Sequence, residues 1–370
     1  MAVEILESKV IFKHEDRYVA WPMISKTKDG ELLVVFSGDR DGHVCPFGKT
    51  FLMRSLDNGD SWQDPELVND TPLDDRDAGL CVCLDGTLLV SWFTTWRNPK
   101  DETLTDAWRE HLEGISDTDV KQWTQPNLTD STLIERGHWI RRSTDNGKTW
   151  EEPIAVPGTA PHGPNVLSDG RLFFVGNEGY RRNDKSSALA CAESKDMGKT
   201  WTVLARVSMF PDAAPSDAGG MRYLGEPHVV EVTPGHLLGM ARHEEQPYVE
   251  GRPTGKLWQF DSFDGGHTWT EPKETPIVGK PPHLHRLPDG RIVVTYGYRQ
   301  APFGERACVS VDGGKTWDVD NEVILRDDAP NHDLGYPATV ACDDGSLLSV
   351  YYQREHLEEK PCLMTTRWRV

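Results

Sequence analysis

An eight-residue phrase of the form Ser-x-Asp-x-Gly-x-Thr/Ser-Trp occurs five times along this chain. Its copies span Ser55 to Trp62, Ser143 to Trp150, Ser194 to Trp201, Ser262 to Trp269 and Ser310 to Trp317. A second phrase, a turn glycine followed by an apolar β-rich run, alternates with the first and occurs six times. Its glycines are Gly30, Gly86, Gly170, Gly235, Gly290 and Gly345. The chain is therefore built from six similar units.

The repeat length indicates the architecture. One unit cannot bury its own apolar face, so the units must pack against one another. A spacing of about 55 residues between turn glycines suits a four-stranded antiparallel blade. We therefore predict an all-β fold, a six-bladed β-propeller, forming a single domain over residues 1–370.

The aspartate of each eight-residue phrase is expected to accept hydrogen bonds from its own turn, and the tryptophan to pack as an apolar anchor. These aspartates are thus predicted to hold the blades together and to take no part in catalysis. The second unit is the longest and contains an insertion at about residues 95–138, with a helix-compatible stretch from Leu104 to Trp123. This partly helical insertion is interpreted either as a lid over the central pocket or as a contact in a homo-oligomer.

Composition excludes several classes of function. A net charge of -19 and a pI near 5.1 argue against a nucleic-acid or anionic-membrane partner. No apolar run is long enough for a membrane span, and the start lacks the apolar core of a signal peptide. We expect a cytoplasmic protein as given, or a secreted or periplasmic one if a signal peptide was removed. The seven scattered cysteines, without a CxxC pair, are predicted to be reduced core thiols, and no cofactor is expected.

The repeats also indicate where a site would form. Because the innermost strand of every blade lines the central axis, equivalent repeat positions should converge on one pocket. Eight residues before the turn glycine, four units have a proline. The residues immediately before these prolines are Trp21, Glu226, Pro281 and Tyr336. We expect Trp21 to contact the substrate.

Glu226 and Tyr336 are polar residues at corresponding positions of the fourth and sixth units. A glutamate beside a tyrosine can take the phenolic proton, which would turn a weak nucleophile into a phenolate at neutral pH. The alternative is a core tyrosine whose hydroxyl is satisfied by a nearby carboxylate.

With these motifs the chain resembles the sialidase superfamily over nearly its whole length; the eight-residue phrase is that family's Asp box. The resemblance implies that Tyr336 is the nucleophile, that Glu226 activates it, and that Arg242, in the strand after the Glu226 hairpin, binds the substrate carboxylate. It implies an acidic glycan as the partner. A neutral phenol suits such a substrate because a carboxylate nucleophile would repel it.

Two further arginines of the family are harder to assign. The first belongs to a phrase like Arg-Ile-Pro, whereas residues 20–22 read Ala-Trp-Pro, so Arg17 or Arg40 would have to substitute for it. The other would come from the fifth unit, which contains Arg299 and Arg306. We favour Arg306, which precedes the fifth Asp box, because a guanidinium binds a carboxylate with two parallel hydrogen bonds.

The family's general acid is an aspartate in the loop after the first turn-glycine strand. Here the candidates are Asp39, Asp41 and His43, and His43 is closest by its distance to the following Asp box. Histidine performs acid/base work near neutral pH. Ordinary polar loop residues are the alternative.

Three histidines, His162, His228 and His283, occupy near-equivalent positions of successive units. They could contact substrate hydroxyls, ligate a metal, act as the base of a lyase, or serve the structure. Substrate contact is our prediction, with no bound metal.

The main hypothesis is an exo-acting glycoside hydrolase that removes a terminal acidic sugar, sialic acid or a relative. A polysaccharide lyase acting at a uronic acid and a non-catalytic carbohydrate-binding propeller remain alternatives.

Overall fold

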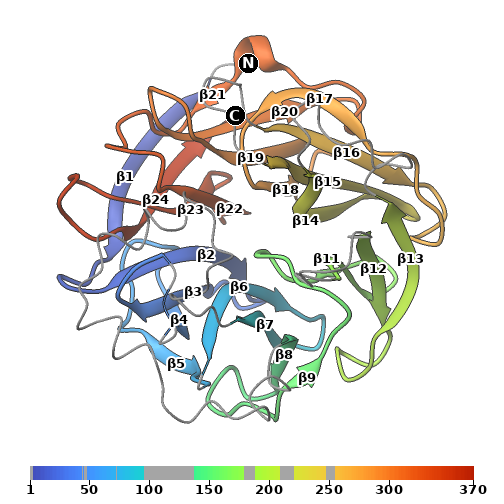
Figure 1. Cartoon of the computed structure of the whole chain (residues 1–370), viewed down its shortest axis with the longest axis horizontal. Coiled ribbons are helices and arrows are strands. Elements are labelled where there is room, and N and C mark those ends of the chain that lie inside the picture. Colours follow the sequence, from blue (N-terminus) through green and yellow to red (C-terminus); the bar gives the residue numbers. More distant parts are fainter. Residues whose placement is uncertain are drawn as a thin grey trace.

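The computed structural model describes residues 3–43, 45, 48–71, 73–95, 137–178, 188–208, 221–246 and 255–370. In these ranges it contains six four-stranded antiparallel sheets arranged in a ring, so the predicted six-bladed β-propeller is confirmed (Figure 1). The helix predicted for residues 104–123, with most of the insertion at 95–138, lies outside the described residues. Within the described part of the chain, the only helix is a short 3₁₀ turn, Val319–Asn321.

The first three sheets follow the chain in order, from the innermost to the outermost strand. Blade one contains β2 (Tyr18–Lys26), β3 (Leu32–Arg40), β4 (Lys49–Ser55) and β5 (Glu66–Asn69). Blade two contains β6 (Asp74–Val82), β7 (Leu88–Thr95), β8 (His138–Ser143) and β9 (Ile154–Ala155). Blade three contains β10 (Asn165–Val166), β11 (Leu172–Asn177), β12 (Ala188–Ser194) and β13 (Thr202–Ser208).

The next two sheets repeat this order, and the last one uses both ends of the chain. Blade four contains β14 (Met221–Thr233), β15 (His236–Gln246), β16 (Lys256–Ser262) and β17 (Lys273–Val278). Blade five contains β18 (Pro282–Arg286), β19 (Ile292–Tyr298), β20 (Gly304–Ser310) and β21 (Val323–Ile324). Blade six contains β22 (Gly335–Ala341), β23 (Leu347–Gln353), β24 (Cys362–Arg369) and, outermost, β1 (Glu4–Phe12).

The ring is closed by hydrogen bonds between the two ends of the chain. Strand β1 pairs antiparallel with β24, from Glu4 opposite Arg369 to Phe12 opposite Leu363. In Figure 1 the blue first strand lies beside the red last strand. This pairing satisfies the edge of blade six with a strand from the start of the sequence.

The Asp boxes link neighbouring blades, as their sequence predicts. In the fifth copy, Asp312 accepts hydrogen bonds from Ser310 Oγ at 2.8 Å and from the backbone N–H of Thr316 at 2.9 Å. A Cβ on Gly314 would lie 1.9 Å from Leu238 Cδ1 of blade four, so only glycine allows this close contact. Trp317 donates to Gln259 Oε1, also on blade four, at 3.0 Å.

All seven cysteines are buried and none forms a disulfide, which agrees with the predicted core thiols. Among the described residues, no helix has the length and hydropathy to cross a membrane.

Candidate functional site

Four of the inner strands share one irregularity near the start of the repeat. At each, a residue other than glycine adopts the left-handed backbone conformation, and the pairing with the second strand shifts register. These residues are Trp21 (φ 53°), Asp77 (φ 55°), Glu226 (φ 47°) and Tyr336 (φ 54°), on β2, β6, β14 and β22. Such conformations are costly for bulky residues and cluster at functional sites. Their repetition on four blades marks the candidate active site.

Glu226 and Tyr336 are in direct contact. The Tyr336 hydroxyl donates a hydrogen bond to Glu226 Oε1 at 2.6 Å. Arg242 joins them, since its Nη1 donates to Tyr336 Oη at 3.2 Å and forms an ion pair with Glu226 Oε2. All three side chains are largely buried. A phenol, a carboxylate and a guanidinium thus lie within hydrogen-bond distance of one another.

The resting protonation of Tyr336 differs from the sequence prediction. Burial raises the pKa of Tyr336 well above 10, and the nearby charges of Glu226 and Asp77 raise it further. Arg242 and Arg299 only partly offset this rise in pKa. The resting group is therefore a neutral phenol and not a phenolate.

Asp77 is a site residue that the sequence analysis missed. Burial raises the pKa of Asp77 to about 7, and the charge of Glu226 adds to the rise, whereas Arg76, Arg40 and Arg242 lower it. Counting eight residues back from Gly86 gives Ala78, so Asp77 occupies the same repeat position as Glu226 and Tyr336. The search for prolines overlooked it, because blade two has alanine there.

The structure brings Arg299, and not the favoured Arg306, to Tyr336. The Arg299 guanidinium carbon lies 5.7 Å from the centre of the Tyr336 ring, and its Nη2 donates to the Leu334 carbonyl at 2.8 Å. Arg306 instead forms an ion pair with Glu322 and stacks 3.5 Å over the Tyr298 ring. Its side chain is therefore engaged within blade five.

Trp21 lies between guanidinium groups at the axis. The Arg40 and Arg76 guanidinium carbons lie 4.8 and 5.2 Å from the centre of its ring, and the ring of Tyr336 lies 6.3 Å away. Trp21 is only 1% exposed, so it forms a wall of the site and offers no open face for a sugar to stack on.

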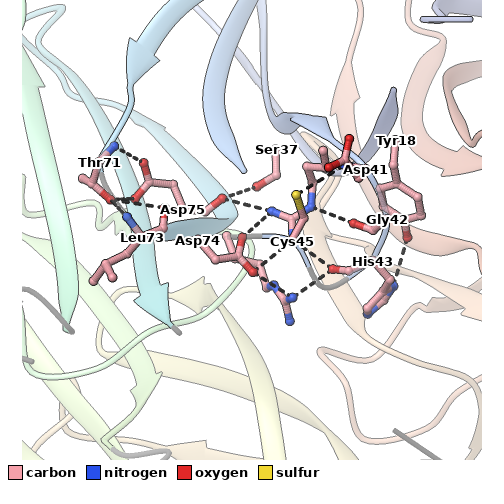
Figure 2. Close-up of polar contacts among 12 residues, drawn as sticks. Tyr18, Ser37, Asp41, Gly42, His43, Cys45, Thr71, Leu73, Asp74 and Asp75 are labelled. Atoms are coloured by element: carbon pink, nitrogen blue, oxygen red, sulfur yellow. Dashed lines mark hydrogen bonds and ion pairs between the residues drawn. The ribbon is translucent and has the colours of Figure 1, made fainter. Parts of the chain in front are cut away.

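Arg40 has no donor left for a substrate carboxylate, contrary to the prediction that it binds one. A guanidinium has five N–H donors. Those of Arg40 go to Asp74 Oδ1 and Oδ2 and to the carbonyls of Gly42, His43 and Asp75 (Figure 2). Its side chain is fully buried and holds the loop after β3 through the carbonyls of Gly42 and His43.

The two acid candidates in this loop have different surroundings. Asp41 forms an ion pair with Arg17, and its carbonyl accepts from Lys360 Nζ at 2.6 Å. His43 is turned toward the axis, where its ring lies 5.0 Å from the ring of Trp21 in an edge-on contact. Its Nδ1 is 2.9 Å from the Tyr18 hydroxyl and 3.5 Å from Asp333 Oδ1.

Asp333 is a carboxylate in the resting site. Burial alone would raise the pKa of Asp333, but hydrogen bonds from His43 and Tyr18 and the charge of Arg354 hold it well below its usual range. A carboxylate behind Nδ1 of His43 fixes the orientation of the ring. Of the two candidates, His43 has the geometry of an acid/base group.

The three histidines are brought together, but as a buried cluster. The rings of His228 and His283 stack at 4.4 Å, and the ring of His162 lies 5.2 and 5.1 Å from them. His228 Nδ1 accepts from the backbone N–H of Leu284 at 2.9 Å, and His283 Nδ1 accepts from that of Thr339 at 3.2 Å.

Each of these two hydrogen bonds fastens one inner strand to the next, so the cluster braces blades four, five and six. At 0 to 3% exposure, the three rings are poor candidates for substrate contact. Among the described residues, no group of three or more His, Cys, Asp or Glu side chains could hold a metal ion.

Comparison with known proteins agrees with this architecture. A family model described as "BNR repeat-like domain" matches residues 115–349. The chain belongs to this family. No curated protein matches this BNR repeat-like chain.

Solved structures of low sequence identity share the fold. A Dyadobacter fermentans protein of unknown function is 24% identical with a TM-score of 0.76, and the match covers 100% of this chain and 99% of that one. The intramolecular trans-sialidase of Ruminococcus gnavus is 16% identical with a TM-score of 0.63, over 97% of both chains. An α-L-arabinanase of Penicillium chrysogenum is 15% identical with a TM-score of 0.65, over 98% of both chains. This BNR repeat-like chain thus shares its fold with these solved structures.

Proposed function

We propose that this protein is an exo-acting glycoside hydrolase that removes a terminal acidic sugar, with Tyr336 as nucleophile, Glu226 as its base and His43 as general acid. The observation that carries the proposal is the 2.6 Å hydrogen bond from Tyr336 to Glu226 at matching bulges of two inner strands. The solved structures with this fold include a trans-sialidase bound to oseltamivir carboxylate and an arabinanase bound to arabinobiose, which supports a carbohydrate substrate.

In the first step Tyr336 Oη attacks the anomeric carbon while the bond from that carbon to the leaving oxygen breaks. The phenolic proton passes to Glu226, and the leaving oxygen takes the broken bond's electron pair together with a proton from His43. In the second step His43 accepts a proton from water, the water oxygen displaces Tyr336, and Glu226 returns its proton to the phenolate. The protein ends in its starting state.

The charges around Tyr336 support an acidic sugar. Arg242 and Arg299 flank the phenol, and both guanidiniums act on its pKa. A carboxylate beside the anomeric carbon would meet these two cations. The neutral resting phenol would approach such a substrate without the repulsion that an ionised carboxylate nucleophile would cause.

Covalent trapping tests the proposal. An acidic glycosyl fluoride with a second fluorine next to the anomeric carbon should form a slow-turnover adduct, and peptide mass spectrometry should locate it on Tyr336. The variant Tyr336→Phe should remain unlabelled. An adduct on Glu226 or Asp77 would contradict the assignment of the nucleophile. Release of an unsaturated uronate that absorbs in the ultraviolet would indicate a lyase, and binding without turnover would indicate a carbohydrate-binding propeller.

A further inference from the structure

A buried ion pair lies directly beneath the loop that carries His43. Arg40, the last residue of β3, and Asp74, the first residue of β6, form two hydrogen bonds, Nη1 to Oδ1 at 2.5 Å and Nη2 to Oδ2 at 3.1 Å. Their side chains are 0 and 3% exposed. The pair therefore joins blade one to blade two at the start of the loop (Figure 2).

Asp74 orients a second guanidinium as well. Arg76 Nη2 donates to Asp74 Oδ2 at 3.0 Å. Both arginines then donate to one acceptor, the backbone carbonyl of His43, at 2.9 Å from Arg40 Nη2 and 2.8 Å from Arg76 Nη2. A single carboxylate thus holds the two cations that fix the His43 backbone.

The ring of His43 is held by a second set of contacts. Tyr18 Oη lies 2.9 Å from its Nδ1 and donates to Asp333 Oδ1 at 2.8 Å. Arg40 of blade one and Arg76 of blade two therefore fix the His43 backbone, whereas Tyr18 of blade one and Asp333, in the loop before blade six, fix its ring. The histidine is thus attached separately at its backbone and at its ring.

Gly48 lies so close to this ion pair that it has no room for a side chain. A Cβ on Gly48 would lie 1.9 Å from Arg40 Nη1 and 2.6 Å from Asp74 Oδ1. The Gly48 carbonyl also accepts from the backbone N–H of Asp75 at 3.0 Å. Any larger residue at position 48 would displace the two charged groups while leaving their chemistry unchanged.

We infer that Asp74 is a positioning residue for His43, acting through Arg40 and Arg76 to set where that imidazole meets the leaving group. This role rests on the proposed function, in which His43 is the general acid. General acid catalysis contributes about 10² to 10⁴-fold, mostly when the leaving group is poor, and a shift of about 1 Å can cost on the order of 10²-fold.

Leaving-group dependence tests the role in the full-length protein. Asp74→Asn should lower kcat/KM, which reports the step in which the leaving group departs, by about 10 to 100-fold on the methyl α-glycoside of N-acetylneuraminic acid, but by less than about threefold on its 4-methylumbelliferyl glycoside. His43→Gln should give the same pattern. The matched control is Glu31→Gln, which removes a partly buried ion pair with Arg54 elsewhere on blade one and should leave both rates unchanged.

Because breaking a buried ion pair can unfold a protein, Gly48→Ala provides a second variant with all charges intact. Hydrogen exchange of the backbone amides of residues 41–43 and 45 should be faster than wild type in Asp74→Asn and Gly48→Ala, but not in Glu31→Gln. Wild-type exchange and wild-type leaving-group dependence in both variants would overturn the inference. If the wild-type protein cleaves neither glycoside, N-acetylneuraminic acid is not the sugar that it removes, and the exchange measurement still decides whether Asp74 holds the loop.

Discussion

The Tyr336 hydroxyl donates a hydrogen bond to Glu226, although 110 residues separate the two in sequence. If this pair forms the nucleophile, Glu226→Gln should lower kcat by about 10² to 10⁴-fold, because the amide cannot accept the phenolic proton. Steady-state kinetics would measure this loss. Tyr351→Phe is the control, since it removes another buried hydroxyl, which bonds Thr366, without touching the pair. Equal losses in the two variants would point to a structural effect.

Substitutions of Arg299 and Arg306 should have different effects on kcat/KM. Arg299→Ala should lower kcat/KM on an acidic glycoside by about 10 to 100-fold, since a hydrogen bond to a charged group contributes about 1.5–3 kcal/mol. Arg306→Ala should change it by less than about twofold, because Arg306 is paired with Glu322. The reverse order would restore the assignment made from sequence.

Asp77 should make stability depend on pH. Its folded pKa is about 7 and its ordinary value is 3.8, so between these values the folded state holds a proton that the unfolded state has lost. Its contribution to stability is therefore present below about pH 4 and is lost as the pH rises to 7.

Asp77→Asn removes this dependence. As the pH rises from about 4 to 7, the free energy of unfolding of the variant should increase relative to that of wild type by up to about 1.4 kcal/mol per pH unit. Urea unfolding at pH 5 and pH 8 would measure this difference. Parallel pH profiles for the two proteins would contradict the prediction.

The histidine cluster should make the propeller sensitive to acid. Burial lowers the pKa of His162 from 6.5 to about 3, and burial with mutual repulsion lowers the values of His228 and His283 further below normal. His285, also buried, has its pKa lowered to about 4 and adds to the same repulsion.

The unfolded state therefore binds more protons below about pH 6.5, and stability falls as the pH falls. His162→Phe should reduce that slope by about one proton, or 1.4 kcal/mol per pH unit. Thermal unfolding at pH 7 and pH 5 would measure it. An unchanged slope would mean that His162 already carries a proton in the folded protein.

The Asp boxes should affect stability and not catalysis. Ser262 is fully buried, donates to Asp264 at 2.8 Å and accepts from the Gly266 backbone N–H at 2.9 Å. Ser262→Ala should cost about 1–3 kcal/mol, because it leaves that N–H unsatisfied. Calorimetry should show a melting temperature lower by several degrees with kcat/KM unchanged. A selective loss of activity would reveal a link to the site that the hydrogen bonds do not suggest.

The repeat determined how much of the fold could be predicted. Turn glycines and Asp boxes are local signals, so six blades followed from spacing alone. The role of β1 could not be predicted in this way, because Glu4 and Arg369 pair over almost the whole length of the sequence and no local motif indicates this pairing. Nor does any repeat unit contain a sequence signal for that outer strand.

The residues of the candidate site could be predicted only where they share one position of the repeat. Glu226 and Tyr336 were found because both precede a proline, whereas Asp77 precedes an alanine and was missed. Arg40 was misjudged because its partner, Asp74, belongs to the next blade and lies 34 residues away. Whether an arginine is free to bind a substrate depends on such partners, which spacing does not reveal.

Strand order in blade six has a consequence for biosynthesis. Tyr336 is on the innermost strand of the one sheet that needs residues from both extremities of the chain. A nascent polypeptide can complete five sheets on the ribosome, yet strand β1 has no strand to pair with until residues 362–369 emerge. Tyr336 would thus be secured last, once residues 362–369 have emerged.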